Sequence, residues 1–107
     1  MKIKNIHNAF TIVESDNNKI ICDPWIEDGI FDGGWGIFPP VENIEKYLNG
    51  TTHCFISHIH EDHFDLNAIK LLDRNVKFFI PDIYPNHVIV NILRGLEFQN
   101  IEMLKPM

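Results

Sequence analysis

The stretch FISHIHEDHFD, residues 55–65, places three histidines and three acidic residues within eleven positions. It follows a short apolar run and precedes a helix-like pattern, so we expect it to connect a buried strand to a helix. Imidazole and carboxylate groups are ligands for borderline and hard divalent ions. We therefore interpret His58, His60, Asp62 and His63 as candidate metal ligands, with a solvated polar loop as the competing interpretation.

The spacing of these four residues suggests which of them would bind the same metal ion. Alternate residues of a strand point the same way, so His58 and His60 can converge on one ion if strand geometry persists through them. Asp62 and His63 lie just beyond, where the chain turns, and can serve a second position. The pattern suits a binuclear site at a strand end, where open α/β sheets hold their ligands.

The sequence upstream of this stretch predicts a hairpin and a long loop. Residues 3–15 have the pattern of one or two strands, DNN at 16–18 is typical of a turn, and 19–23 fits the returning strand. Glycine, proline and aromatic residues at 29–40 indicate a loop. Residues 40–50 predict a helix that Pro40 opens, that Gly50 closes, and whose apolar face is Val41, Ile44, Tyr47 and Leu48.

Downstream, strand and helix patterns alternate, which predicts a largely parallel α/β sheet. The expected strands are 53–57, 76–80 (ended by Pro81) and 101–105. A helix is expected over 65–73, with Asp65 as its N-cap. A second is expected from residue 85, ended by Gly95. Their apolar faces are predicted to be Leu66, Ile69 and Leu72 in the first, and Val88, Ile89, Ile92, Leu93 and Leu96 in the second.

Composition limits the functional classes. The chain has 107 residues, which suits one domain, with 45% hydrophobic residues and a net charge of −6. Lysine and arginine are scattered, so a general nucleic-acid or anionic-membrane surface is disfavoured. Cys22 and Cys54 sit in strand-like segments, and we expect buried free thiols in a reduced, cytoplasmic compartment, although the sequence alone leaves a disulfide open.

The remaining histidines and the loop aromatics carry weaker signals. His7, His53 and His87 stand alone, so a structural or surface role is favoured for each. Trp25, Trp35 and Phe38 sit on or beside the glycine-rich loop. Their rings could form an apolar wall for a substrate or simply cover the core, and the sequence favours neither.

SHIHEDHFD, residues 57–65, resembles the His-x-His-x-Asp-His signature of the metallo-β-lactamase fold superfamily. The early hairpin that runs into DPW at 23–25 is similar to that superfamily's strand ending in IDP. The segment DPWI…WGIFPP also resembles the branch that holds ascorbate-6-phosphate lactonase, N-acylphosphatidylethanolamine phospholipase and CMP-sialic acid hydroxylase-like proteins. The resemblance implies a metal-dependent hydrolase.

The resemblance also implies roles for individual residues. His58 and His60 would bind a first metal, and Asp62 and His63 a second, with zinc as the default and manganese or iron as alternatives. The metals would activate a water that attacks an ester, lactone, amide or phosphodiester, and Asp62 would help to orient that water. Asp23 would accept a hydrogen bond from a ligand imidazole.

The family's later ligands, a further histidine, a bridging carboxylate and a last histidine, have no counterpart within residues 64–107, since neither Asp82 nor His87 matches their expected positions. The predicted fold class is therefore α/β: residues 1–107 form a single domain that corresponds to the N-terminal half of an αββα sandwich, a mixed sheet with helices on one face. The other face would be apolar and available to a missing C-terminal half or a second copy of the chain.

Three functions remain open at this stage. The first is a hydrolase of small-molecule substrates, incomplete in this chain, which alone should bind metal weakly and turn over little substrate. The second is a non-catalytic module that dimerises through its exposed sheet face. The third is an oxygenase that uses iron at the same ligands.

Overall fold

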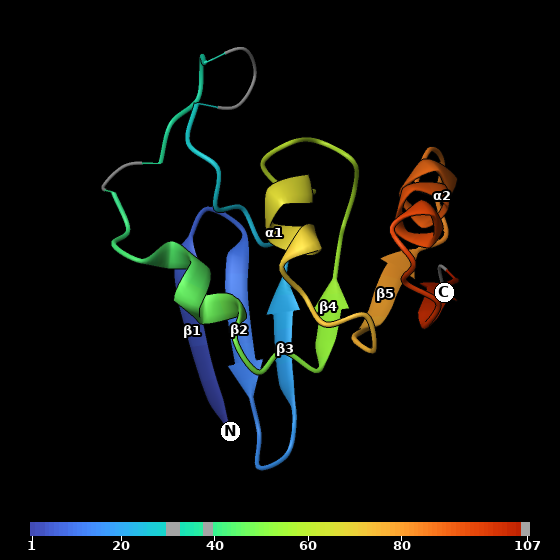
Figure 1. Cartoon of the computed structure of the whole chain (residues 1–107), viewed down its shortest axis with the longest axis horizontal. Coiled ribbons are helices and arrows are strands. Elements are labelled where there is room, and N and C mark those ends of the chain that lie inside the picture. Colours follow the sequence, from blue (N-terminus) through green and yellow to red (C-terminus); the bar gives the residue numbers. More distant parts are fainter. Residues whose placement is uncertain (30–32, 38–39, 106–107) are drawn as a thin grey trace.

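The computed structural model describes residues 1–29, 33–37 and 40–105. Within these residues the chain forms a six-stranded sheet whose strands follow one another in space as they do in sequence (Figure 1). The strands are β1 (Lys2–His7), β2 (Phe10–Glu14), β3 (Lys19–Cys22), β4 (His53–Phe55), β5 (Lys77–Pro81) and β6 (Ile101–Leu104). Neighbours from β1 to β3 run antiparallel, and neighbours from β3 to β6 run parallel. The fold is thus a mixed α/β sheet, and the expected parallel part begins at β3.

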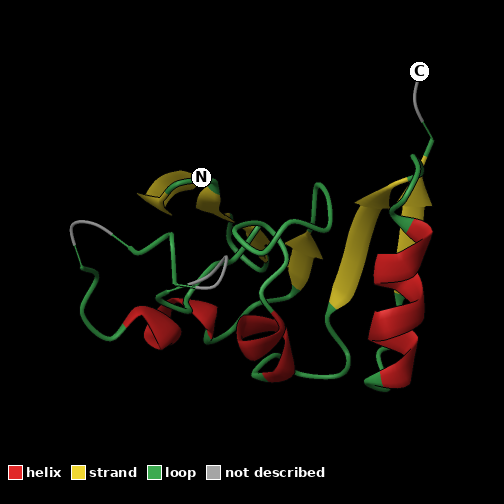
Figure 2. Ribbon diagram, turned by 90° about the horizontal axis from the view of Figure 1, so that it is seen from above, coloured by secondary structure: helices red, strands yellow, loops and turns green. Residues whose placement is uncertain are grey.

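Three short helices pack on one face of this sheet (Figure 2). They are the 3₁₀-helix η1 (Ile44–Leu48) and the α-helices α1 (Leu66–Lys70) and α2 (His87–Gly95). The helix predicted over 40–50 is wrong in type and extent, because its N-cap Asn43 has a left-handed φ of 51° and gives no side-chain cap. Only Ile44 and Leu48 of η1 are buried, so a single tight turn suffices to place them in the core.

Helix α1 begins where the sequence predicts. The Asp65 carboxylate accepts hydrogen bonds from the backbone amides of Asn67 and Ala68, at 2.9 and 3.4 Å, so its N-cap role is confirmed. The prediction that Leu66 faces the core is wrong: its side chain is 39% exposed, and the inward face of this five-residue helix is Ala68 and Ile69.

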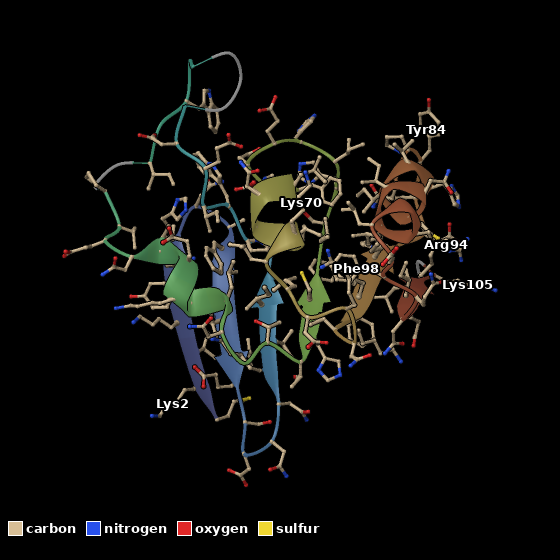
Figure 3. The ribbon with its side chains drawn as sticks, in the orientation of Figure 1. Lys2, Lys70, Tyr84, Arg94, Phe98 and Lys105 are labelled. Atoms are coloured by element: carbon tan, nitrogen blue, oxygen red, sulfur yellow. The ribbon has the colours of Figure 1, made fainter. Side chains whose placement is uncertain are left out.

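Helix α2 ends at Gly95, as predicted, and buries Ile89, Val90 and Leu93. Val88 lies outside this stripe and is exposed, which corrects the predicted apolar face. Just after the helix in sequence, the ring of Phe98, labelled in Figure 3, packs edge-on against Phe78 at 5.0 Å between centroids. No helix among the described residues is long and apolar enough to span a bilayer.

The two faces of the sheet differ in how well they are covered. Register places Ile12, Ile21, Cys54 and Phe78 side by side on the helix-covered face, where all are buried. We call the opposite face the outer sheet face, and no described helix lies over it. Its partly exposed apolar side chains are Val13, Ile20, Cys22, Phe55 and Phe79. Both cysteines are free, but they occupy opposite faces, and only Cys54 is fully buried.

Candidate metal centre

The candidate ligands lie in the loop that joins β4 to α1 at the carboxyl end of the parallel strands (Figure 1). The prediction that strand geometry continues to Ser57 is wrong, because β4 ends at Phe55. The amide of Ile56 still bonds to the carbonyl of Phe79, but the next amide, of Ser57, donates to the Asp23 carboxylate at 2.7 Å. The ladder stops there, and His58 leaves the sheet.

The three imidazoles nevertheless gather in this loop. The ring centroids of His58 and His63 lie 4.0 Å apart, and those of His58 and His60 lie 4.7 Å apart in an edge-to-face arrangement. His60 is exposed, whereas His58 and His63 are half-buried. The loop therefore brings together the rings that the sequence assigned to one site, without the alternation of a strand.

Asp62 lies beside the third imidazole and is 7% exposed. Its Oδ2 is 3.3 Å from Nε2 of His63 and accepts a hydrogen bond from the side-chain amide of Asn8 at 3.1 Å. Asn8 sits in the turn between β1 and β2 with a φ of 49°, a conformation that asparagine tolerates. No motif links this turn to a loop 54 residues away, so Asn8 cannot be recognised from the sequence as a partner of Asp62.

Asp23 holds the other side of the His63 ring. It follows β3 directly, with a φ of 45°, and its amide extends the β3–β4 ladder by donating to the carbonyl of Phe55. Its Oδ2 lies 2.8 Å from Nδ1 of His63, so the contact expected between Asp23 and an imidazole of the loop is present. The other ring nitrogen, Nε2, faces Oδ2 of Asp62. A metal-binding histidine that donates Nδ1–H to a carboxylate uses Nε2 to bind the ion.

The electrostatic environment favours neutral histidine at His58. Partial burial lowers its pKa, the neighbouring imidazoles of His63 and His60 lower it further, and the carboxylates of Asp23 and Asp62 oppose the shift. A neutral imidazole is the form that binds metal ions, so this environment suits a ligand.

The same shift makes a prediction for the metal-free chain. Because the pKa of His58 is lower in the folded state, the unfolded chain binds more protons near pH 6.5, and stability rises with pH there. The free energy of unfolding should therefore fall as the pH drops below the ordinary histidine pKa of about 6.5. Urea unfolding at several pH values checks this, and His58→Ala should flatten the dependence. A slope that His58→Ala leaves unchanged would assign the effect to another group.

The donor chemistry of this loop fits a divalent metal, although its side chains do not close around one. Across the described part of the chain, no three His, Cys, Asp or Glu side chains meet in a metal-binding arrangement. The carboxylate-anchored ring of His63, with Nε2 facing Asp62, is nonetheless typical of a metal ligand and its outer partner. Binding here would require side-chain rotation in the loop or ligands from outside these residues.

The aromatic residues separate by burial. Trp25 is 3% exposed, and its ring lies 4.8 Å from that of His7, so Trp25 covers the core. Trp35 is half-exposed, with its ring 6.5 Å from that of Trp25. Phe38 lies outside the described residues, and any role in a substrate wall stays a prediction.

The three isolated histidines have the structural or surface positions expected of them. Nε2 of His7 lies 2.6 Å from the carbonyl oxygen of Trp25. His53 stacks on Phe79 at 5.7 Å between ring centroids. The imidazole of His87 is exposed and lies 3.1 Å from the Asp82 carboxylate. None of these three rings joins the contacts among His58, His60 and His63.

No protein-family profile matches the chain. Among curated proteins it is similar to a protein of Mycolicibacterium smegmatis provisionally named a Rieske 2Fe-2S iron-sulfur protein, with 28% identity over 94% of this chain and 19% of the relative. It is also similar to the UPF0173 protein YddR of Bacillus subtilis, with 27% identity over 97% of this chain and 43% of the relative. The chain thus spans less than half of either protein.

The name of the first relative raises the question of a cluster site in this chain. A Rieske cluster is held by two cysteines and two histidines. The chain has two cysteines, and the β3–β4 register puts Cys22 and Cys54 on opposite faces of the sheet. Cys22 and Cys54 therefore cannot hold a Rieske cluster together.

Two solved structures share the fold. One is an isothiocyanate hydrolase from Delia radicum gut bacteria, with a TM-score of 0.71 and 21% identity over 98% of this chain and 42% of that chain. The other is a possible metal-dependent hydrolase from Veillonella parvula, with a TM-score of 0.70 and 19% identity over 94% of this chain and 41% of that chain. This chain therefore shares its mixed sheet with helices on one face with part of each of these two solved structures.

Proposed function

We propose that this chain supplies part of the metal centre of a metal-dependent hydrolase, with His58, His60, Asp62 and His63 as ligands. The observation that carries the proposal is the meeting of three imidazoles beside the buried Asp62, with Asp23 holding His63 from behind. This group lies at the carboxyl end of the parallel strands, where α/β sheets place their sites. Two zinc ions are the expected cofactor, from the histidine-rich donor set.

In a metal-dependent hydrolysis, the chain's own residues would orient the attacking water and the metal ligands. A divalent metal, when bound, lowers the pKa of a coordinated water into the neutral range. Asp62 would help to orient that water, and the side-chain amide of Asn8 donates a hydrogen bond that holds Asp62 in place. Asp23 would keep the Nε2 lone pair of His63 available. The substrate class we propose is an ester, lactone, amide or phosphodiester of a small molecule in the cytoplasm.

The test of this function is a joint measurement of metal content and hydrolysis. The complete protein should contain about two divalent ions, and His63→Ala should lower metal content and turnover together. The 107-residue chain alone should bind metal weakly and show little turnover on a panel of phosphodiesters and lactones. Hydrolysis that persists after complete removal of metal would contradict the proposal.

Iron at these ligands would favour an oxygenase instead. Imidazole and carboxylate donors accept zinc, manganese and iron, so elemental analysis of the protein as produced separates the two classes. The sequence of the loop over 23–40 resembles the branch that holds the lactonase, the phospholipase and the hydroxylase-like proteins. We propose that the chain belongs to this branch, which includes both hydrolysis and hydroxylation.

The outer sheet face supports a second candidate function, an interaction module. Its partly exposed apolar side chains, among them Val13, Ile20 and Phe79, would be covered if a second copy of the chain packed against them. For this candidate we propose the second copy as the partner, because these apolar side chains lie on the neighbouring strands β2 to β5 of one sheet face.

Self-association through this face is measurable. Val13→Lys should shift the chain toward monomer in sedimentation experiments, because it places a charge in the centre of the contact. Asn67→Lys makes the same change of charge at an exposed position of α1, on the opposite side of the sheet. It should leave the oligomeric state measured by sedimentation unchanged. A monomer at every concentration in the unmodified chain would reject the second copy as partner.

A further inference from the structure

The geometry points to Ser57 as a positioning residue that sets the tautomer of His58. The Ser57 hydroxyl oxygen lies 2.7 Å from Oδ2 of Asp23 and 2.8 Å from Nδ1 of His58. It therefore stands between the buried carboxylate and the imidazole, and neither the motif nor any similarity assigns it a role.

The proton count in this network has one consistent solution. A carboxylate only accepts hydrogen bonds, so the 2.7 Å contact requires that the Ser57 hydroxyl donate to Asp23. The hydroxyl has then used its single proton, and its contact with His58 must be one in which Nδ1–H donates to the Ser57 oxygen. His58 is thereby fixed as the Nδ1–H tautomer, with the Nε2 lone pair available.

One carboxylate in this way orients two imidazoles. Oδ2 of Asp23 lies 2.8 Å from Nδ1 of His63, so it orients that ring directly. It orients the ring of His58 through the hydroxyl of Ser57, which contacts both Oδ2 of Asp23 and Nδ1 of His58. In His58 this leaves Nε2 as the acceptor atom, whereas Nε2 of His63 faces Oδ2 of Asp62 at 3.3 Å. The centroids of the two rings are 4.0 Å apart, so the network that orients His63 also reaches His58.

The backbone of Ser57 is clamped on both sides, which fixes the position of its hydroxyl. Its amide donates to Oδ1 of Asp23 at 2.7 Å. Its carbonyl accepts from the side-chain amide of Asn86 at 2.9 Å, and Asn86 is fully buried and also donates to the carbonyl of Pro81 at 3.0 Å. The start of α2 thus holds the loop against β5, and Ser57 cannot move without breaking these bonds.

The experiment reads the tautomer directly, in the metal-free chain. Nitrogen-15 NMR of the histidine rings at about pH 8, where His58 is neutral, should show the Nδ1–H tautomer at His58 in the unmodified chain. Ser57→Ala should shift His58 toward the Nε2–H form that free histidine prefers, while Ser57→Thr, which keeps the hydroxyl, should retain Nδ1–H. Ser15→Ala removes the chain's other serine hydroxyl, in an exposed turn, and should change nothing.

A second readout rests on the proposed metal site. Ser57→Ala should weaken Zn²⁺ binding by about 10-fold, the usual effect of losing an outer partner of a metal ligand, and Ser57→Thr should restore it. An Nε2–H tautomer at His58 in the unmodified chain would overturn the inference even if Ser57→Ala failed to fold. Because that signal is recorded without metal, its failure is distinguishable from failure of the hydrolase proposal.

Discussion

Alanine at both His58 and His60 is expected to reduce the affinity of the chain for Zn²⁺ by at least about 100-fold, since losing even an outer partner of a ligand costs 10–100-fold. These two rings touch each other edge-on, and His58 also contacts His63, so the double change removes two of the three imidazoles in the loop. Calorimetric titration of the metal-free chain with Zn²⁺ measures the effect.

A matched control keeps the number of histidines equal. His53→Ala with His87→Ala also removes two imidazoles, but one stacks on Phe79 and the other is exposed beside Asp82. This variant should bind Zn²⁺ like the unmodified chain. If the His58 and His60 variant kept its affinity while the control lost it, the ligand assignment would be wrong.

Alanine at Asp65 is expected to lower the free energy of unfolding by about 3–5 kcal/mol, from the loss of a helix cap and of charged hydrogen bonds. The Asp65 side chain is 3% exposed. Its Oδ1 caps α1, and its Oδ2 accepts from the amides of Ile26 and Glu27, each at 2.8 Å. One carboxylate therefore joins the helix after the histidine loop to the segment after Asp23.

Urea unfolding followed by circular dichroism measures this loss. Asp73→Ala is the control, because Asp73 is exposed and accepts a single local bond from the amide of Asn75. It should cost about 1 kcal/mol or less. A loss under about 1 kcal/mol for Asp65→Ala would show that the four amide contacts contribute little to stability.

Local signals in the sequence predicted the elements that local chemistry determines. The N-cap at Asp65 and the end of α2 at Gly95 follow from backbone hydrogen bonding within a few residues. The helix predicted over 40–50 failed because apolar spacing alone does not distinguish a full α-helix from one 3₁₀ turn, and Asn43 adopts a left-handed conformation.

The candidate site shows the same limit. The motif predicts which imidazoles gather, because all three lie within six residues. It cannot predict that Asn8 reaches Asp62, or that Ser57 and Asn86 hold the loop, because those contacts depend on how β1, β5 and α2 pack. Asp23 could be proposed only from the resemblance, and its contact with His63 depends on the β3–β4 register.

Metal binding by the imidazoles of the histidine loop is tested most directly by zinc K-edge X-ray absorption of the chain, with the protein in large excess over Zn²⁺ so that the metal is bound. We expect multiple-scattering features of at least two imidazoles, with Zn–N distances of about 2.0–2.1 Å. These features should disappear in the His58→Ala, His60→Ala variant. A shell of oxygen ligands alone, identical in the two proteins, would contradict the account.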